Sequence, residues 1–170
     1  MKIKVDGKDV ADTEYAQEKI LLDTNLLVFA HNRGSPHYAK ASRILVASLQ
    51  DALRLYISTQ SVLEFFSVMT NPRKIKPTPS SQDVTRICSD LLLTRKIRKI
   101  FPQTATGEAI EIAEKKSLRG PQIFDCLLAV TAKQNQIDRI WTENLSDFKY
   151  FEELVAVENP LEMEWELVHS

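Results

Sequence analysis

Short apolar runs alternate with longer amphipathic segments along most of the chain. The short runs are rich in Leu, Ile and Val, and we expect buried strands over residues 19–23, 53–58, 96–101, 138–142 and 154–158. The longer segments repeat their apolar positions at helical spacing and predict helices over residues 24–32, 35–52, 59–70, 80–94, 104–117 and 122–135. Strands that alternate with helices indicate an α/β domain with a mostly parallel sheet.

Proline marks several of the expected helix boundaries. Ser35 is expected to cap the second helix, with Pro36 at its first position. The third helix is expected to stop at Asn71-Pro72, because a residue that precedes proline is disfavoured in the helical region. Residues 71–80, NPRKIKPTPS, then form a proline-rich basic loop.

Both ends of the chain carry a second, strand-like alternation. Lys2 and Lys4 alternate with apolar residues near the start, and three glutamates alternate with apolar residues over 161–167. Opposite charges that face each other across two strands contribute about 0.2 to 1 kcal/mol per pair. We therefore hypothesise that the two ends pair as strands, with two solvated ends as the alternative.

Length, composition and charge fit one ordinary globular domain, residues 1–170. The chain has 170 residues, of which 44% are hydrophobic and 26% charged. Its 22 Lys and Arg against 23 Asp and Glu leave a net charge of −1, so no overall basic field attracts polyanions. Any surface for nucleic acid is therefore expected to be local.

The cysteines and the absence of long apolar runs indicate a cytoplasmic protein. Cys88 and Cys126 lie in apolar helical segments and are expected to be buried thiols in a reducing compartment. No apolar run approaches the roughly 20 residues that cross a bilayer, and the N-terminus lacks the apolar core of a signal peptide. We expect no contact with a membrane.

Three carboxylates lie inside apolar runs, whereas most acids of this chain have polar neighbours. Asp23 lies in ILLDTNLLVFA, Glu64 in SVLEFFSVM and Asp125 in IFDCLLAV. An ionised carboxylate withdrawn from water is costly unless it is paired. Asp23 ends the first expected strand, while Glu64 and Asp125 lie about one turn into their helices. All three can therefore face the carboxyl edge of the sheet, where open α/β sheets bind ligands.

A fourth acid follows the strand expected at 138–142. In WTENLSDF both Glu143 and Asp147 are expected in the loop after that strand, with Asp147 preferred and Glu143 in reserve. Converging carboxylates repel unless a cation joins them, and carboxylate oxygens suit Mg²⁺ or Mn²⁺. Such a centre activates water for in-line attack on a phosphodiester. The structural alternatives are a helix cap for Asp23 and a favourable helix N-terminus for Asp125.

Other chemistries have little support in the sequence. His31 and His37 flank the segment NRGSP and are more typical of solvated loop residues than of an acid–base pair, and His169 is in the tail. No Cys/His cluster has zinc-finger spacing, and no phosphate-binding glycine motif or nucleophile elbow is present.

Four segments, in their order along the chain, resemble the motifs of PIN-domain ribonucleases, in particular the VapC-like toxins of prokaryotic toxin–antitoxin pairs. The segments are LLDTN, STQSVLEFF, IFDCLLA and WTENLSDF. The resemblance covers residues 19–160, which leaves an N-terminal extension of residues 1–18 and a C-terminal acidic tail of residues 161–170. It implies a three-layer α/β/α fold with a short, mostly parallel central sheet. It also implies Mg²⁺- or Mn²⁺-dependent endonucleolytic cleavage of RNA, an antitoxin partner and a homodimer.

The resemblance also assigns residues. Asp23, Glu64 and Asp125 match the acidic triad; Asn25 matches the polar residue two positions after the first acid, and Thr142 a hydroxyl residue that helps to order the site. The fourth acid differs among relatives. Some have Asp where this chain has Asn144, and others use the acid before the Phe, here Asp147.

Binding of RNA next to carboxylates requires cations nearby. Weak candidates are Arg33, Arg73, Lys74 and Lys76, and for each of them a solvated surface charge is the alternative. Two other functions stay open. One is a catalytically weak PIN-like module that binds RNA or a partner protein; the other is a phosphotransfer domain with Asp23 as acceptor, although DTN supplies only one acid there.

Overall fold

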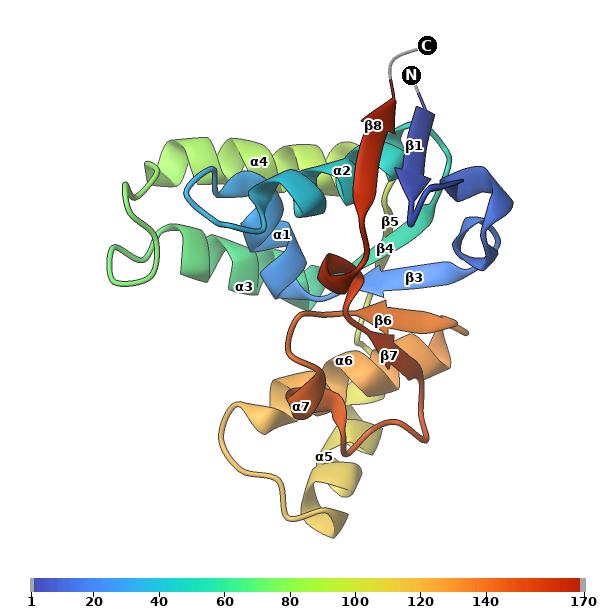
Figure 1. Ribbon diagram of the computed structural model, residues 1–170. Helices are drawn as coiled ribbons and strands as arrows, with labels where there is room; N and C mark the ends of the chain where they lie inside the picture. Colours follow the sequence, from blue (N-terminus) through green and yellow to red (C-terminus); the bar gives the residue numbers. More distant parts are fainter. Residues whose placement is uncertain (1, 169–170) are drawn as a thin grey trace.

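A five-stranded, wholly parallel sheet forms the centre of the molecule. The structure is a computed structural model that describes residues 2–168. The strand order is β5-β4-β3-β6-β7 (Figure 1). The strands are β3 (Lys19–Leu22), β4 (Arg54–Ser58), β5 (Arg98–Ile100), β6 (Arg139–Trp141) and β7 (Ala156–Glu158). The five strands expected from the sequence are confirmed, and each is one to three residues shorter than expected.

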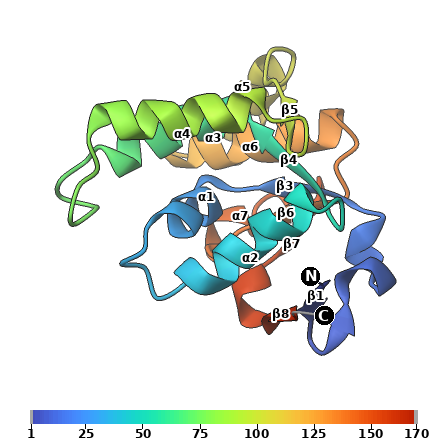
Figure 2. The same ribbon diagram turned by 90° about the horizontal axis from the view of Figure 1, so that it is seen from above.

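Helices cover both faces of this sheet. They are α1 (Thr24–His31), α2 (Tyr38–Leu49), α3 (Thr59–Met69), α4 (Ser81–Leu93), α5 (Ala105–Lys115), α6 (Gln122–Gln134) and α7 (Leu145–Phe148). Figures 1 and 2 together show α2 and α5 on opposite sides of the sheet. The expected three-layer α/β/α arrangement is therefore confirmed.

Alternation along the strands divides the interior into two cores. Ile20 and Leu22 of β3 belong to the core beneath α1 to α4, whereas Leu21 belongs to the core beneath α5 and α6. Because successive side chains of a strand point to opposite faces, this uninterrupted apolar run is what a sheet buried on both faces requires.

The two ends of the chain meet in a second sheet with the order β2-β1-β8. Strand β1 (Lys2–Val5) pairs antiparallel with β2 (Lys8–Asp9) and with β8 (Trp165–Val168), and Lys4 lies opposite Glu166 (Figure 1). The pairing hypothesis is therefore confirmed for the described residues. Residues 169–170 of the expected tail, including His169, lie outside the described residues.

Three short 3₁₀ helices complete the description of this end of the molecule. η1 (Val10–Asp12) and η2 (Glu14–Ala16) lead from the small sheet into β3, and η3 (Pro160–Glu162) precedes β8. Glu162 therefore belongs to a helical turn, whereas the sequence pattern had placed it in a strand. The division into an extension, a core over 19–160 and a tail stays a prediction.

The structure corrects two expectations from the sequence. Helix α2 begins at Tyr38, because the Ser35 hydroxyl accepts a hydrogen bond from the His37 backbone N–H (3.1 Å) and closes a turn before the helix. Cys126 is buried, but Cys88 is partly exposed on α4. None of the helices within residues 2–168 is long and apolar enough to cross a membrane.

Candidate functional site

Four carboxylates line one cleft at the carboxyl edge of the central sheet. The cleft has a volume of about 470 Å³ and is lined by Asp23, Glu64, Asp125 and Asp147, among others. Asp23 follows β3, Glu64 lies on α3 directly after β4, Asp125 lies on α6, and Asp147 on α7 after β6. The topology thus brings together acids that are far apart in the sequence.

Asp23 is held by backbone and side-chain contacts at the end of β3. Its backbone N–H continues the sheet by donating to the carbonyl of Trp141 (3.0 Å). Its carboxylate accepts from the Thr24 backbone N–H (2.6 Å) and from the Thr142 hydroxyl (2.7 Å). The helix-cap interpretation is therefore confirmed, since Asp23 caps α1. Burial nevertheless raises the pKa of Asp23 to about 6, against the lowering effect of these two hydrogen bonds.

Glu64 is oriented from two sides. The Thr24 hydroxyl donates to one carboxylate oxygen (3.2 Å), and the Gln60 side-chain amide donates to the other (2.6 Å). Thr24 thus contacts two of the four acids, Asp23 through its backbone and Glu64 through its hydroxyl. The other side-chain atom of Gln60, Oε1, is buried without a hydrogen-bond partner in the described chain.

The pKa of Asp125 is raised further than that of Asp23. Burial raises its pKa most, and with the smaller effects of the Asp23, Asp147 and Glu64 charges, in that order, the pKa reaches about 7. No ion pair within residues 2–168 includes any of the four acids. Lys74 lines the same cleft but forms no ion pair with them.

Asn25 and Thr142 connect the first acid to the segment after β6. The Asn25 side chain donates to the Thr142 hydroxyl (2.9 Å) and accepts from the Glu143 backbone N–H (3.4 Å). The Thr142 hydroxyl in turn donates to Asp23 and accepts from the Asn144 backbone N–H (3.1 Å). This network fits the site-ordering part expected for both residues.

The two candidates for the fourth acid are placed differently. Asp147 lines the cleft, together with Asn144, whereas Glu143 does not. Asp147 also lies on the short helix α7, which corrects the expectation of a loop there. The geometry favours Asp147.

The donor set fits a hard divalent cation. All four side chains offer carboxylate oxygens, which suit Mg²⁺ or Mn²⁺. In the part of the chain that the structure describes, no three His, Cys, Asp or Glu side chains are already gathered closely enough to hold an ion. Uncompensated carboxylates repel one another, and Mg²⁺ needs only one or two of them because it keeps several waters.

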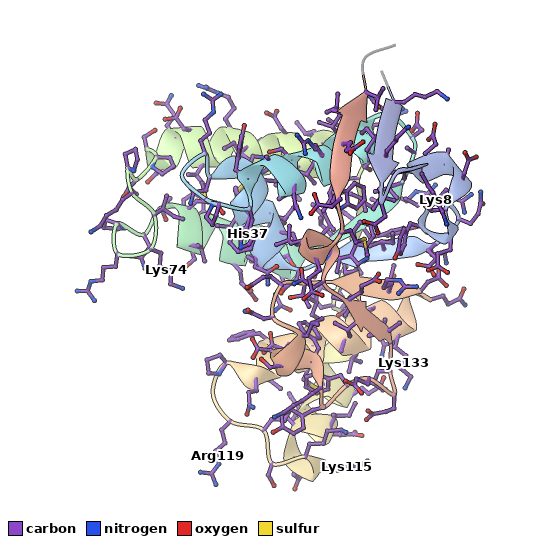
Figure 3. All side chains as sticks on the ribbon, in the orientation of Figure 1. Lys8, His37, Lys74, Lys115, Arg119 and Lys133 are labelled. Atoms are coloured by element: carbon purple, nitrogen blue, oxygen red, sulfur yellow. The ribbon has the colours of Figure 1, made fainter. Side chains whose placement is uncertain are left out.

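Among the weak candidates for binding RNA, only Lys74 lines the cleft. Figure 3 shows Lys74 on the loop between α3 and α4, and Arg119 on the loop before α6. Arg33 borders a neighbouring pocket, and neither Arg73 nor Lys76 lines the acidic cleft. Of the four candidate cations, Lys74 is therefore the one that lies at the acidic cleft.

The histidines lie elsewhere. The His31 ring contacts the Leu27 carbonyl (2.8 Å) and stacks edge-on with Phe65, and burial lowers its pKa. His37 packs against Phe29. Neither histidine lines the acidic cleft.

Three contributors to the cleft were missed in the sequence: Thr24, Gln60 and Phe124. Gln60 precedes Glu64 by four residues, the spacing at which helical side chains meet, so this contact was readable in the sequence. Thr24 and Phe124 are direct neighbours of Asp23 and Asp125, but neighbouring positions alone do not say that a side chain turns into a cleft.

The family model that describes the PIN domain matches residues 20–153. The chain belongs to the PIN domain family. One relative is "Ribonuclease VapC24" of Mycobacterium tuberculosis (strain CDC 1551 / Oshkosh), which is 22% identical over 130 residues, 76% of this PIN protein and 89% of the relative. The resemblance stated from the sequence is confirmed at the level of the family.

Two crystal structures share the fold. VapC20 of Mycobacterium tuberculosis, described as a sarcin–ricin loop cleaving toxin, aligns with a TM-score of 0.59 at 13% identity, covering 76% of this chain and 95% of its own. VapBC2 of Rickettsia felis, bound to a DNA fragment from their promoter, aligns with a TM-score of 0.55 at 21% identity, covering 87% and 99%. At these identities the likeness shows the fold of the PIN domain alone.

Proposed function

We propose that this PIN-domain protein is a Mg²⁺- or Mn²⁺-dependent endoribonuclease that hydrolyses RNA phosphodiester bonds, and that it is the toxin of a type II toxin–antitoxin pair. The observation that carries the proposal is one cleft lined by four acids, none of which forms an ion pair in the described chain. Membership of the PIN family and the similarity to a protein named as a ribonuclease support it.

Asp23, Glu64, Asp125 and Asp147 would hold the metal, and Glu143 remains the reserve ligand from outside the cleft lining. When bound there, a divalent ion lowers the pKa of a coordinated water and neutralises charge on a phosphate oxygen. Its charge would also remove the repulsion that raises the pKa of Asp125.

The chain's own residues supply orientation. Thr142 and the Thr24 backbone fix the Asp23 carboxylate, while Gln60 and the Thr24 hydroxyl fix Glu64. Asn25 keeps Thr142 in place. Because carboxylates fixed in this way need little rearrangement when a ligand arrives, these two of the four proposed ligands would be oriented before a metal binds.

RNA must approach an acidic cleft of a chain whose net charge is −1. Lys74, the only cation among the described residues that line the cleft, is placed to pair with a phosphate. Arg33, Arg73 and Lys76 would add weaker, screened attraction from outside the cleft.

An antitoxin protein is the proposed partner, and the proposed assembly is a homodimer in the cytoplasm. The fold shared with the VapBC2 structure supports a protein of the VapBC type. Copurification of the chain with the product of an adjacent small reading frame tests the partner, and sedimentation tests the dimer.

The catalytic proposal is tested with RNA in the presence of Mg²⁺ or Mn²⁺. We expect the wild type to cut the RNA, a chelator to block the cut, and Asp23→Asn or Asp125→Asn to lose it by about a hundredfold or more, because each removes a metal-binding oxygen. Glu152→Gln, an exposed acid outside the cleft, is the matched control and should cut normally.

Two further variants identify the fourth acid. Asp147→Asn should lose most of the activity, and Glu143→Gln should keep it; the reverse result would move the fourth ligand to Glu143. Equal cutting by wild type, Asp23→Asn and Asp125→Asn would exclude the carboxylate mechanism. In that case a module that binds RNA or a partner without cutting would be the better description.

A further inference from the structure

The acidic cleft has a second, apolar side. Its lining includes five apolar residues as well as the acids: Val28, Phe29, Val68, Pro121 and Phe124. Phe124 is the most solvent-exposed of the large apolar side chains there, at 52%. Single exposed apolar residues are common, but an aromatic ring next to acids in a cleft is a place where a ligand gains by covering it.

The position of Phe124 is fixed relative to the acids. It precedes Asp125 on α6, and its carbonyl accepts a hydrogen bond from the Gln60 side chain (3.3 Å). The same Gln60 amide donates to Glu64 (2.6 Å). One side chain of α3 therefore ties the backbone of Phe124 to a candidate metal ligand, so that ring and acids keep their spacing.

The side chains that line the cleft indicate what kind of ligand it would bind. The acids, once joined by a cation, take a phosphodiester; Lys74 takes a second phosphate; and the exposed ring of Phe124 in the same lining offers a stacking surface. Every nucleobase has a π face, and unpaired bases stack on aromatic side chains with little regard to sequence. A base held inside a duplex has no such face free.

We propose that Phe124 is the stacking platform for an unpaired base adjacent to the phosphodiester held at the acids. The proposal rests on the proposed ribonuclease function for its location, and it adds a base-binding subsite to that function. Phe29 and Val68 form the apolar wall beside this base.

The test introduces a fluorescent reporter at the platform. The two native tryptophans, Trp141 and Trp165, are buried at 0% and 1% exposure, so Phe124→Trp adds an exposed indole that can be observed separately by its red-shifted emission and by acrylamide quenching. Asp23→Asn as background blocks cleavage and lowers the negative charge of the cleft, and Mg²⁺ is present so that the remaining acids can hold the phosphodiester. The probes are a short single-stranded RNA, the same RNA annealed to its complement, and an abasic strand of equal length.

We expect the single-stranded RNA to quench the new emission and to protect it from acrylamide, and the abasic strand and the duplex to leave it unchanged. Phe101→Trp is the matched control, because Phe101 is 57% exposed but does not line the cleft, and its emission should not respond. Equal responses to the abasic and the intact strand would overturn the proposal.

Affinity supplies the second measurement. In the same background Phe124→Ala should bind single-stranded RNA about five- to tenfold more weakly, at the lower end of what a stacked base contributes. Phe124→Leu should be weakened nearly as much, because it is apolar but not aromatic, and Phe124→Tyr should restore binding. Equal affinity of all four proteins would overturn the proposal.

Two outcomes separate this proposal from its neighbours. If Phe124→Ala converts a dimer into a monomer in sedimentation, the ring is a contact between copies and the stacking proposal falls. If base-dependent quenching is seen but the wild type does not cut RNA with Mg²⁺ or Mn²⁺, the hydrolytic function falls and the base-binding subsite stands.

Discussion

Two clusters of acids in this molecule have opposite electrostatics. Around Arg139 at the start of β6, Glu18 receives two hydrogen bonds from the guanidinium (2.8 and 2.9 Å), and Glu158 lies 3.2 Å from it. The Glu158 carboxylate also accepts from Tyr15 (3.1 Å) and from Trp141 (3.2 Å). In the cleft, the four acids form no ion pair with any cation of the described chain.

The comparison distinguishes the acids around Arg139, which form a structural cluster, from the acids of the cleft, which form the candidate functional one. Arg139 is held by its acids, which raise its pKa, and burial and the charge of Glu158 raise the pKa of Tyr15 to about 12. Every charge there has a partner inside the protein. In the cleft the acids have no ion-pair partner in the described chain. They repel one another unless a cation from outside binds between them.

The largest expected effect comes from breaking the satisfied cluster. Arg139→Met leaves Glu18 and Glu158 partly buried without their cation, and we expect a loss of about 2–4 kcal/mol in the free energy of unfolding, somewhat below the cost of a fully buried orphan. Urea unfolding measures it. Arg139→Lys should recover part of the loss, since it keeps the charge but not the paired hydrogen bonds. An unchanged midpoint would mean that the cluster is merely solvated.

The acids of the cleft, which form no ion pair in the described chain, should be visible in the pH dependence of the protein's stability. Asp23 and Asp125 have folded-state pKa values of about 6 and about 7, above the ordinary value of 3.8. A raised folded-state pKa means that the folded state holds the proton more tightly, so the stabilisation is present below about pH 4 and is lost as pH rises to about 7. In chelator, therefore, these two raised pKa values should make the melting temperature fall between about pH 4 and about pH 7. The double variant Asp23→Asn, Asp125→Asn should show a flatter dependence of melting temperature on pH. A profile that is equally steep in the double variant would contradict the comparison.

Removing a single acid should have the opposite sign from removing Arg139. In chelator at pH 8, Asp125→Asn should stabilise the protein by about 0.5–1 kcal/mol, a figure reduced for screening because the side chain is partly exposed. The same variant should lose most of the rise in melting temperature that Mn²⁺ gives the wild type. Glu152→Gln serves as control for an exposed acid, and a destabilised Asp125→Asn would show that this carboxylate is structural.

The smallest effect is expected in the sheet that joins the chain ends. Lys4 faces Glu166 across β1 and β8, and Lys4→Gln should cost a few tenths of a kcal/mol, within the 0.2 to 1 kcal/mol of such pairs. Glu166→Gln should cost the same, and the two changes together should cost less than their sum. Strict additivity in urea unfolding would show that the pair contributes nothing.

Local pattern predicted the strands, the helices and three of the cleft acids, because each acid interrupts an apolar run. For the fourth acid it favoured Asp147 and kept Glu143 in reserve, since α7 has only four residues and no periodicity of its own. Nor did it find the Arg139 cluster, whose members Glu18 and Arg139 are 121 residues apart. Such pairings follow from the parallel strand order, and the sequence pattern supports the existence of the strands without giving that order.

Boundaries failed where a side chain competed with the backbone. Ser35 and Pro36 have the residue types of a helix start, but the hydroxyl of Ser35 closes a turn and the helix begins three residues later, at Tyr38. Cys88 has apolar neighbours in sequence, yet α4 is an outer helix and turns it partly to solvent.

The pairing of β1 with β8 also has a consequence for synthesis. During translation β1 emerges early and has to wait for the strand at residues 165–168, on the order of ten seconds later at ordinary elongation rates. Trp165 of that last strand packs edge-on against Trp141 (5.7 Å between ring centroids), the residue before Thr142, which orients Asp23. The nascent chain therefore completes the packing beneath its acidic cleft only once β8 has been synthesised.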